Sequence, residues 1–73
     1  MLSMKEFCER LRELRLSRGL SQRDTANLLG VSRSAYANYE QGTREPSFVL
    51  LVRICREFRV SSDDLLGIAD DIS

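Results

Sequence analysis

Arginine is the residue type in this sequence that offers the most chemistry. Ten of the 11 basic residues are arginines, and Lys5 is the exception. A guanidinium donates two hydrogen bonds at once from a planar fork, which suits phosphate groups and the edge of guanine. Solvated helix faces also use arginine, and we expect most of these residues to be of that kind.

The sequence lacks the side chains on which many enzymes depend. It contains no histidine, so Ser–His and Cys–His nucleophile pairs are excluded. Cys8 and Cys55 form no CxxC motif, and structural zinc usually takes four ligands where this chain offers two. We expect both to be buried, reduced thiols. The prediction is a protein that is not an enzyme, with no catalytic residue, no metal site and no cofactor.

The net charge is zero, but the charges are unevenly distributed. Residues 1–60 contain all 11 basic residues and seven acidic ones, a net charge of +4, whereas residues 61–73 contain only acidic ones. This asymmetry leaves a nucleic-acid partner open. No apolar run approaches the ~18 residues of a membrane span, and the N-terminus is charged too early for a signal peptide. We expect no membrane association and one small cytoplasmic domain over residues 1–73.

Serine and glycine mark where the helices that carry these charges begin and end. Ser3 opens a capping box with Glu6, and Gly19 can supply the left-handed residue that stops the first helix. The same punctuation predicts helices over 22–29 and 33–41.

A longer helix and a short one follow. Ser47 caps the longer helix, whose apolar positions form a broad stripe: Phe48, Leu51, Val52, Cys55 and Phe58. Ser61 caps a short helix around 63–66. Because no segment alternates with period two, the predicted fold class is all-α with five helices.

The second and third predicted helices are joined by a very short link, Gly30-Val31-Ser32. Such a link forces a sharp crossing, which is the helix-turn-helix construction. At 100° per residue, Tyr36 and Tyr39 point to one side of the third helix. The opposite face carries no carboxylate and consists of Arg33, Ser34, Ala37, Asn38 and Gln41. In a helix-turn-helix, this is the helix that enters the major groove of DNA.

The sequence resembles the Cro/CI-type (XRE-type) helix-turn-helix family, which contains lambda-repressor-like regulators. The resemblance covers about residues 7–67, with the helix-turn-helix at about 21–42, and rests on Ser21-Gln22, Ala26, Leu29-Gly30-Val31-Ser32, Tyr36, Tyr39-Glu40-Gln41-Gly42 and Pro46. It implies a compact five-helix domain, binding of a double-stranded operator as a homodimer, and control of transcription. Arg59 stands where Gly or Asn often ends the fourth helix, so we expect an unusual turn there.

The resemblance also implies roles for individual residues. The base-reading positions are Arg33, Ser34, Ala37 and Asn38, where Arg pairs with guanine, Asn pairs with adenine, and Ala can meet a thymine methyl. The positions that contact the DNA backbone are Gln22, Arg23, Ser32, Thr43, Arg44 and Arg15. Arg15 and Glu40 resemble a pair that links the first helix to the third. The alternatives are a solvated polar face and independent surface charges.

The apolar residues near the end of the chain allow two interpretations. Leu65, Leu66, Ile68 and Ile72 either cap the core or meet their copies across the two-fold axis of a dimer. Two functions compete in the same way. One is a repressor that binds a palindromic operator and occludes a promoter. The other is an interaction module, such as an antitoxin-like protein that holds a protein partner.

Overall fold

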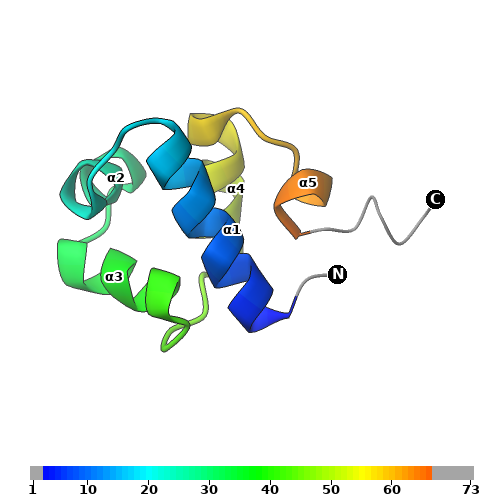
Figure 1. Ribbon diagram of the computed structural model, residues 1–73, viewed down its shortest axis with the longest axis horizontal. Helices are drawn as coiled ribbons and strands as arrows, with labels where there is room; N and C mark the ends of the chain where they lie inside the picture. The colour runs from blue at the N-terminus through cyan, green and yellow to red at the C-terminus, as the bar shows by residue number, and fades with distance from the viewer. Residues whose placement is uncertain (1–2, 67–73) are drawn as a thin grey trace.

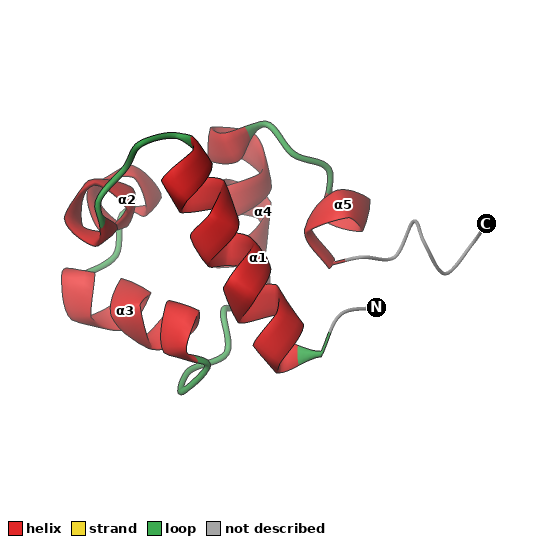
Figure 2. Ribbon diagram, viewed as in Figure 1, coloured by secondary structure: helices red, strands yellow, loops and turns green. Residues whose placement is uncertain are grey.

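The computed structural model describes residues 3–66 and contains five helices in that range. They are α1 (Met4–Ser17), α2 (Gln22–Leu29), α3 (Arg33–Gln41), α4 (Phe48–Phe58) and α5 (Ser62–Leu66). Figure 2 shows helices joined by loops, with no strand in the described part of the chain. The predicted all-helical fold with five helices is confirmed, and so are the bounds of α2 and α3.

Most helix ends lie at or near the serine and glycine residues predicted to cap them. Ser3 and Ser21 each form a capping box, in which the serine side chain accepts from the third helical amide. Gly19 lies two residues beyond the end of α1 with φ +68°, in the left-handed region. Arg59 ends α4 with φ +55°, the only non-glycine residue in the described chain with positive φ. The unusual turn expected at Arg59 is therefore confirmed.

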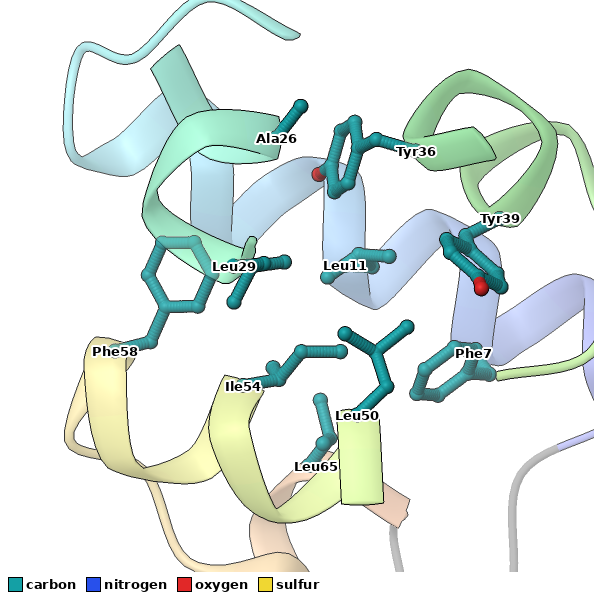
Figure 3. Close-up of a cluster of buried hydrophobic side chains, with 10 residues drawn as sticks. All are labelled: Phe7, Leu11, Ala26, Leu29, Tyr36, Tyr39, Leu50, Ile54, Phe58 and Leu65. Atoms are coloured by element: carbon teal, nitrogen blue, oxygen red, sulfur yellow. The ribbon is translucent and has the colours of Figure 1, made fainter. Parts of the chain in front are cut away.

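The arrangement of the helices puts α1 at the centre. In Figure 1, α2 and α3 lie on one side of α1, α5 lies on the other, and α4 runs behind. The core between them is a single cluster, drawn in Figure 3, made of Phe7, Leu11, Ala26, Leu29, Tyr36, Tyr39, Leu50, Ile54, Phe58 and Leu65. Both tyrosines are buried, as predicted, so α3 is anchored through its aromatic face.

The structure corrects the apolar stripe predicted for α4. The residues of α4 that face the core are Leu50, Ile54 and Phe58, whereas Phe48 and Val52 are exposed. Consecutive residues differ by about 100° around a helix, so Leu51 and Cys55 lie beside the core-facing row rather than in it. The helix thus has two neighbouring apolar faces, and only one of them is buried in the core.

The two cysteines are free thiols in different surroundings. Cys8 is buried and donates a hydrogen bond from Sγ to the carbonyl oxygen of Tyr39 at 3.1 Å, whereas Cys55 is half-buried rather than fully buried. Burial raises the pKa of both thiols above the ordinary value. No helix among residues 3–66 is long and apolar enough to cross a membrane, and no acidic or thiol cluster in that range is arranged to hold a metal ion.

Candidate nucleic-acid interface

The turn between α2 and α3 is fixed by backbone hydrogen bonds. Gly30 adopts φ +72°, and the amide of Val31 donates to the carbonyl of Ala26 at 3.0 Å, closing the end of α2. Ala26 is buried where the helices approach, and Val31 is half-buried in the turn. Ser32 then caps α3 by accepting from the amide of Ala35 at 3.1 Å. These contacts hold α3 at a set angle to α2.

The face of α3 opposite the two tyrosines is accessible. Arg33 and Ser34 are exposed, while Ala37 and Asn38 are half-buried, and all four belong to the set predicted to read bases. Because the tyrosines are held in the core, this face is turned away from the rest of the molecule. The helix therefore presents three hydrogen-bonding side chains, those of Arg33, Ser34 and Asn38, on a rigid support.

Glu40 joins three helices through hydrogen bonds. Arg15 donates from Nε to Glu40 Oε2 at 2.6 Å and from a terminal nitrogen to Oε1 at 3.2 Å. Gln22 donates from Nε2 to the same Oε1 at 3.3 Å. The side chains of Arg15 and Glu40 are only 11% and 5% exposed. The structure thus brings Arg15 and Glu40 together and adds Gln22, which sequence reasoning had assigned only to the DNA backbone.

The buried carboxylate of Glu40 stays charged because its partners outweigh the cost of burial. Burial alone raises its pKa, but its hydrogen bonds, first among them those from Arg15, lower the pKa by more, so the pKa lies below the ordinary value for glutamate. Glu40 is also the only acidic residue of α3. With Glu40 paired inside the molecule, the outward face of α3 carries no negative charge to repel a phosphate.

One surface hollow gathers basic and polar side chains from the first three helices. The hollow is lined by one residue of α1, Arg15. It is also lined by three residues at the start of α2, Ser21, Gln22 and Arg23, and by Arg33 at the start of α3. The N-terminus of a helix carries unpaired amides and a partial positive charge, which favours anions such as phosphate. The only carboxylate in the first turn of α2, Asp24, is engaged in accepting from the amide of Ser21 at 3.2 Å.

The loop after α3 holds the two remaining backbone candidates. Thr43 contacts Asn38 through its side-chain oxygen, and the guanidinium carbon of Arg44 lies 5.7 Å from the centre of the Tyr39 ring. Both residues are exposed. Their contacts keep them close to the end of α3, with Thr43 beside Asn38 and Arg44 beside Tyr39.

The residues predicted for a dimer contact fall into three groups. Leu65 is 1% exposed inside the core, so it packs within the chain rather than on a surface. Leu66 is half-buried and lines an apolar groove between α4 and α5, together with Phe48, Leu51, Val52, Cys55 and Ser62. Ile68 and Ile72 lie outside the described residues. Phe48 and the neighbouring Val49 are 78% and 74% exposed, although the predicted apolar stripe had included Phe48.

Two short helices joined by a tight turn, the second with an accessible polar face, define a helix-turn-helix DNA-binding domain. The chain belongs to the HTH_3 helix-turn-helix family, whose model matches residues 11–65. This is the Cro/CI/XRE-type family of transcriptional regulators, which are not enzymes. The resemblance found in the sequence is therefore confirmed.

Two regulators and one solved structure show how close the similarity is. The chain is 44% identical to the HTH-type transcriptional regulator AnsR of Bacillus subtilis (strain 168) over 59 residues, covering 81% of this chain and 51% of AnsR. It is 37% identical to the regulator YobD of the same organism over 65 residues, covering 89% of this chain and 58% of YobD. The chain thus spans about half the length of the curated relatives it matches.

The solved structure is that of the restriction-modification controller protein C.AhdI from Aeromonas hydrophila. Its TM-score with this chain is 0.79 at 35% sequence identity, over 85% of this chain and 94% of that one. The compact five-helix architecture is therefore shared with a protein of nearly the same extent.

Proposed function

We propose that this chain binds a palindromic operator in double-stranded DNA as a homodimer and represses transcription by occluding a promoter. The observation that carries the proposal is the hollow where Arg15, Gln22, Arg23 and Arg33 converge beside a face of α3 free of negative charge. Positive side chains from three helices around one helix N-terminus suit the phosphates of a DNA backbone.

The residues divide into those that read bases and those that hold the backbone. Arg33 and Asn38 extend from the first two turns of α3, which suits guanine and adenine in the major groove, with Ser34 and Ala37 between them. Gln22, Arg23, Ser32 and Arg44 lie at the ends of helices or in the following loop, where the phosphates would pass. Arg15 has two roles, since it pairs with Glu40 and also lines the hollow where a phosphate would lie.

The dimer contact that we propose is the apolar groove between α4 and α5. Phe48, Val52 and Leu66 leave apolar surface at this groove, and α5 lies on the side of α1 opposite α2 and α3 (Figure 1). A second copy bound there would leave the DNA-facing side uncovered. An operator with two half-sites about 34 Å apart requires a two-fold arrangement of this kind.

The experiment that tests the proposal is selection of bound DNA from a random pool with the purified chain. We expect enrichment of a palindrome with two half-sites about one helical turn apart. If no sequence is enriched and a specific protein partner is captured instead, the antitoxin-like interaction module is the correct interpretation.

A matched pair of variants tests which residues read the bases and which contact the DNA backbone. Arg33→Ala is expected to lose about 1–3 kcal/mol on the enriched site and little on scrambled DNA. Arg44→Ala removes the same charge but is expected to weaken binding to both DNAs and reduce the salt dependence by about one unit. Affinities for both DNAs at several salt concentrations give the answer. If Arg33→Ala weakens both DNAs equally and Arg44→Ala changes base preference, α3 is not the reading helix.

A further inference from the structure

The end of α3 brings Thr43 back over Asn38. Gly42 ends the helix with φ +80°, and the amide of Thr43 donates to the carbonyl of Asn38 at 3.1 Å. In this position the Thr43 hydroxyl oxygen lies 3.3 Å from the Asn38 carbonyl oxygen and 3.2 Å from Asn38 Oδ1. The first residue beyond the helix cap therefore touches the side chain that we propose reads a base.

The chemistry of this contact orients the Asn38 amide. Both neighbours of the Thr43 hydroxyl are acceptor oxygens, so the hydroxyl is the donor, and its single hydrogen is shared between the backbone carbonyl and Oδ1 of Asn38. With Oδ1 turned toward Thr43, the NH2 group of Asn38 is turned away from it. The terminal torsion of asparagine is broad and roughly two-fold, so an unsupported amide presents either its oxygen or its NH2 group.

We infer that Thr43 is a positioning residue that sets the base preference of Asn38. This inference rests on the proposed function, because it requires that α3 lie in the major groove. With its NH2 group presented outward, Asn38 donates to an acceptor such as purine N7 or thymine O4. Thr43 thereby contributes to specificity without touching a base.

A role in binding the backbone alone would have a different signature. A hydroxyl that only donates to a phosphate carries no sequence information, so its loss weakens binding to all sequences equally. Base preference at a single position is therefore the measurement that separates the two roles. Thr43 is exposed, so valine, which has the same shape without the hydroxyl, is expected to leave the fold unchanged.

The test uses the full chain and the DNA site enriched from the random pool. The base pair read by Asn38 is identified as the one at which Asn38→Ala loses discrimination. We expect Thr43→Val to reduce discrimination at that same base pair about two- to tenfold, the effect of one hydrogen bond. Thr43→Ser keeps the hydroxyl and is expected to restore it. In an Asn38→Ala background, Thr43→Val is expected to change discrimination no further.

Two results would overturn the inference. One is an equal loss of affinity for the enriched site and its altered version in Thr43→Val, which would make Thr43 a backbone contact only. The other is a change in base preference that persists in the Asn38→Ala background, since Thr43 would then act by another route. Thermal unfolding of each variant verifies that the fold is retained. If the unaltered protein enriches no DNA site, the proposed function itself fails, and the inference fails with it.

Discussion

The two halves of this molecule share one apolar core but differ in their polar contacts and in the apolar surface that they leave exposed. In the half formed by α1, α2 and α3, the carboxylate of Glu40 accepts hydrogen bonds from Arg15 and Gln22, so one side chain links three helices. In the half formed by α4 and α5, apolar packing dominates, and Phe48, Val49 and Val52 remain exposed. In the first half, polar side chains bond to one another inside the molecule. In the second half, part of the apolar surface is left uncovered by the core.

The difference indicates a separation of tasks. Hydrogen bonds between charged groups are directional, so they fix the angle of α3 and the positions of the arginines around it. Apolar contact is not directional and scales with area, which suits association with another surface. If this is so, α1–α3 should depend on the hydrogen bonds of Glu40, and association with a second copy should depend on the apolar surface of α4 and α5.

The largest effect is expected from loss of the Glu40 carboxylate. Glu40→Ala leaves the mostly buried guanidinium of Arg15 without its partner, and breaking such a pair from one side costs about 3 kcal/mol or more. We expect a loss of stability of that size in urea unfolding, together with weaker DNA binding. Glu57→Ala, which removes an exposed carboxylate from α4, is the control and should change stability by less than about 0.5 kcal/mol. Equal unfolding midpoints for the two variants would show that the polar link does not stabilise this half.

The next largest effect is expected from a charge placed in the α4–α5 groove. Phe48→Asp removes an exposed aromatic at the first position of α4, where a carboxylate favours the helix, so folding should be preserved. If the groove holds a second copy, this change should weaken the dimer by about 2 kcal/mol or more.

Sedimentation equilibrium measures that effect directly. Leu16→Asp is the matched control, because Leu16 is another exposed apolar residue, located on α1 outside the groove. It should leave the dimer intact. A chain that stays monomeric at all concentrations, or a dimer insensitive to Phe48→Asp, would remove the groove from the proposal.

The smallest effect is expected from acid. The folded state holds the pKa of Glu40 below its ordinary value of about 4.3, so the pair stabilises the fold above that pH. The contribution is lost as the pH falls through the lower, folded pKa. We expect the stability difference between the unaltered protein and Glu40→Gln to shrink as the pH falls into the acid range. Urea unfolding from neutral pH down to about pH 3 tests this. A difference that stays constant would mean that Glu40 does not carry the pH dependence.

The parts of the fold that sequence reasoning predicted are those determined locally. Ser21 and Ser32 cap the helices that follow them, and Gly30 in the left-handed region ends α2. Each signal acts over three or four residues, so the bounds of α2 and α3 can be read from the chain alone. The same reasoning identified Tyr36 and Tyr39 as core residues, because their spacing puts them on one face of α3.

The parts that could not be predicted depend on contacts between distant segments. Phe48 and Leu50 are both apolar and lie about 200° apart around α4, so only one of them can face the core, and the packing of α4 against the other helices buries Leu50 and leaves Phe48 exposed. Leu65, for which a place in the core and a dimer contact were both open, is buried in the core. The hydrogen bond between Gln22 and Glu40 is a further case, since no local pattern relates these two positions.

The shared core has a consequence for how the protein is made. Every side chain assigned to DNA contact lies at or before Arg44, but the core beneath Tyr36 and Tyr39 includes Leu50, Ile54 and Phe58 from α4 and Leu65 from α5 (Figure 3). During synthesis, which runs from the N-terminus, the nascent chain therefore carries its complete set of binding side chains before the packing that orients them exists. The surface that we propose for DNA is therefore complete only after α4 and α5 have left the ribosome.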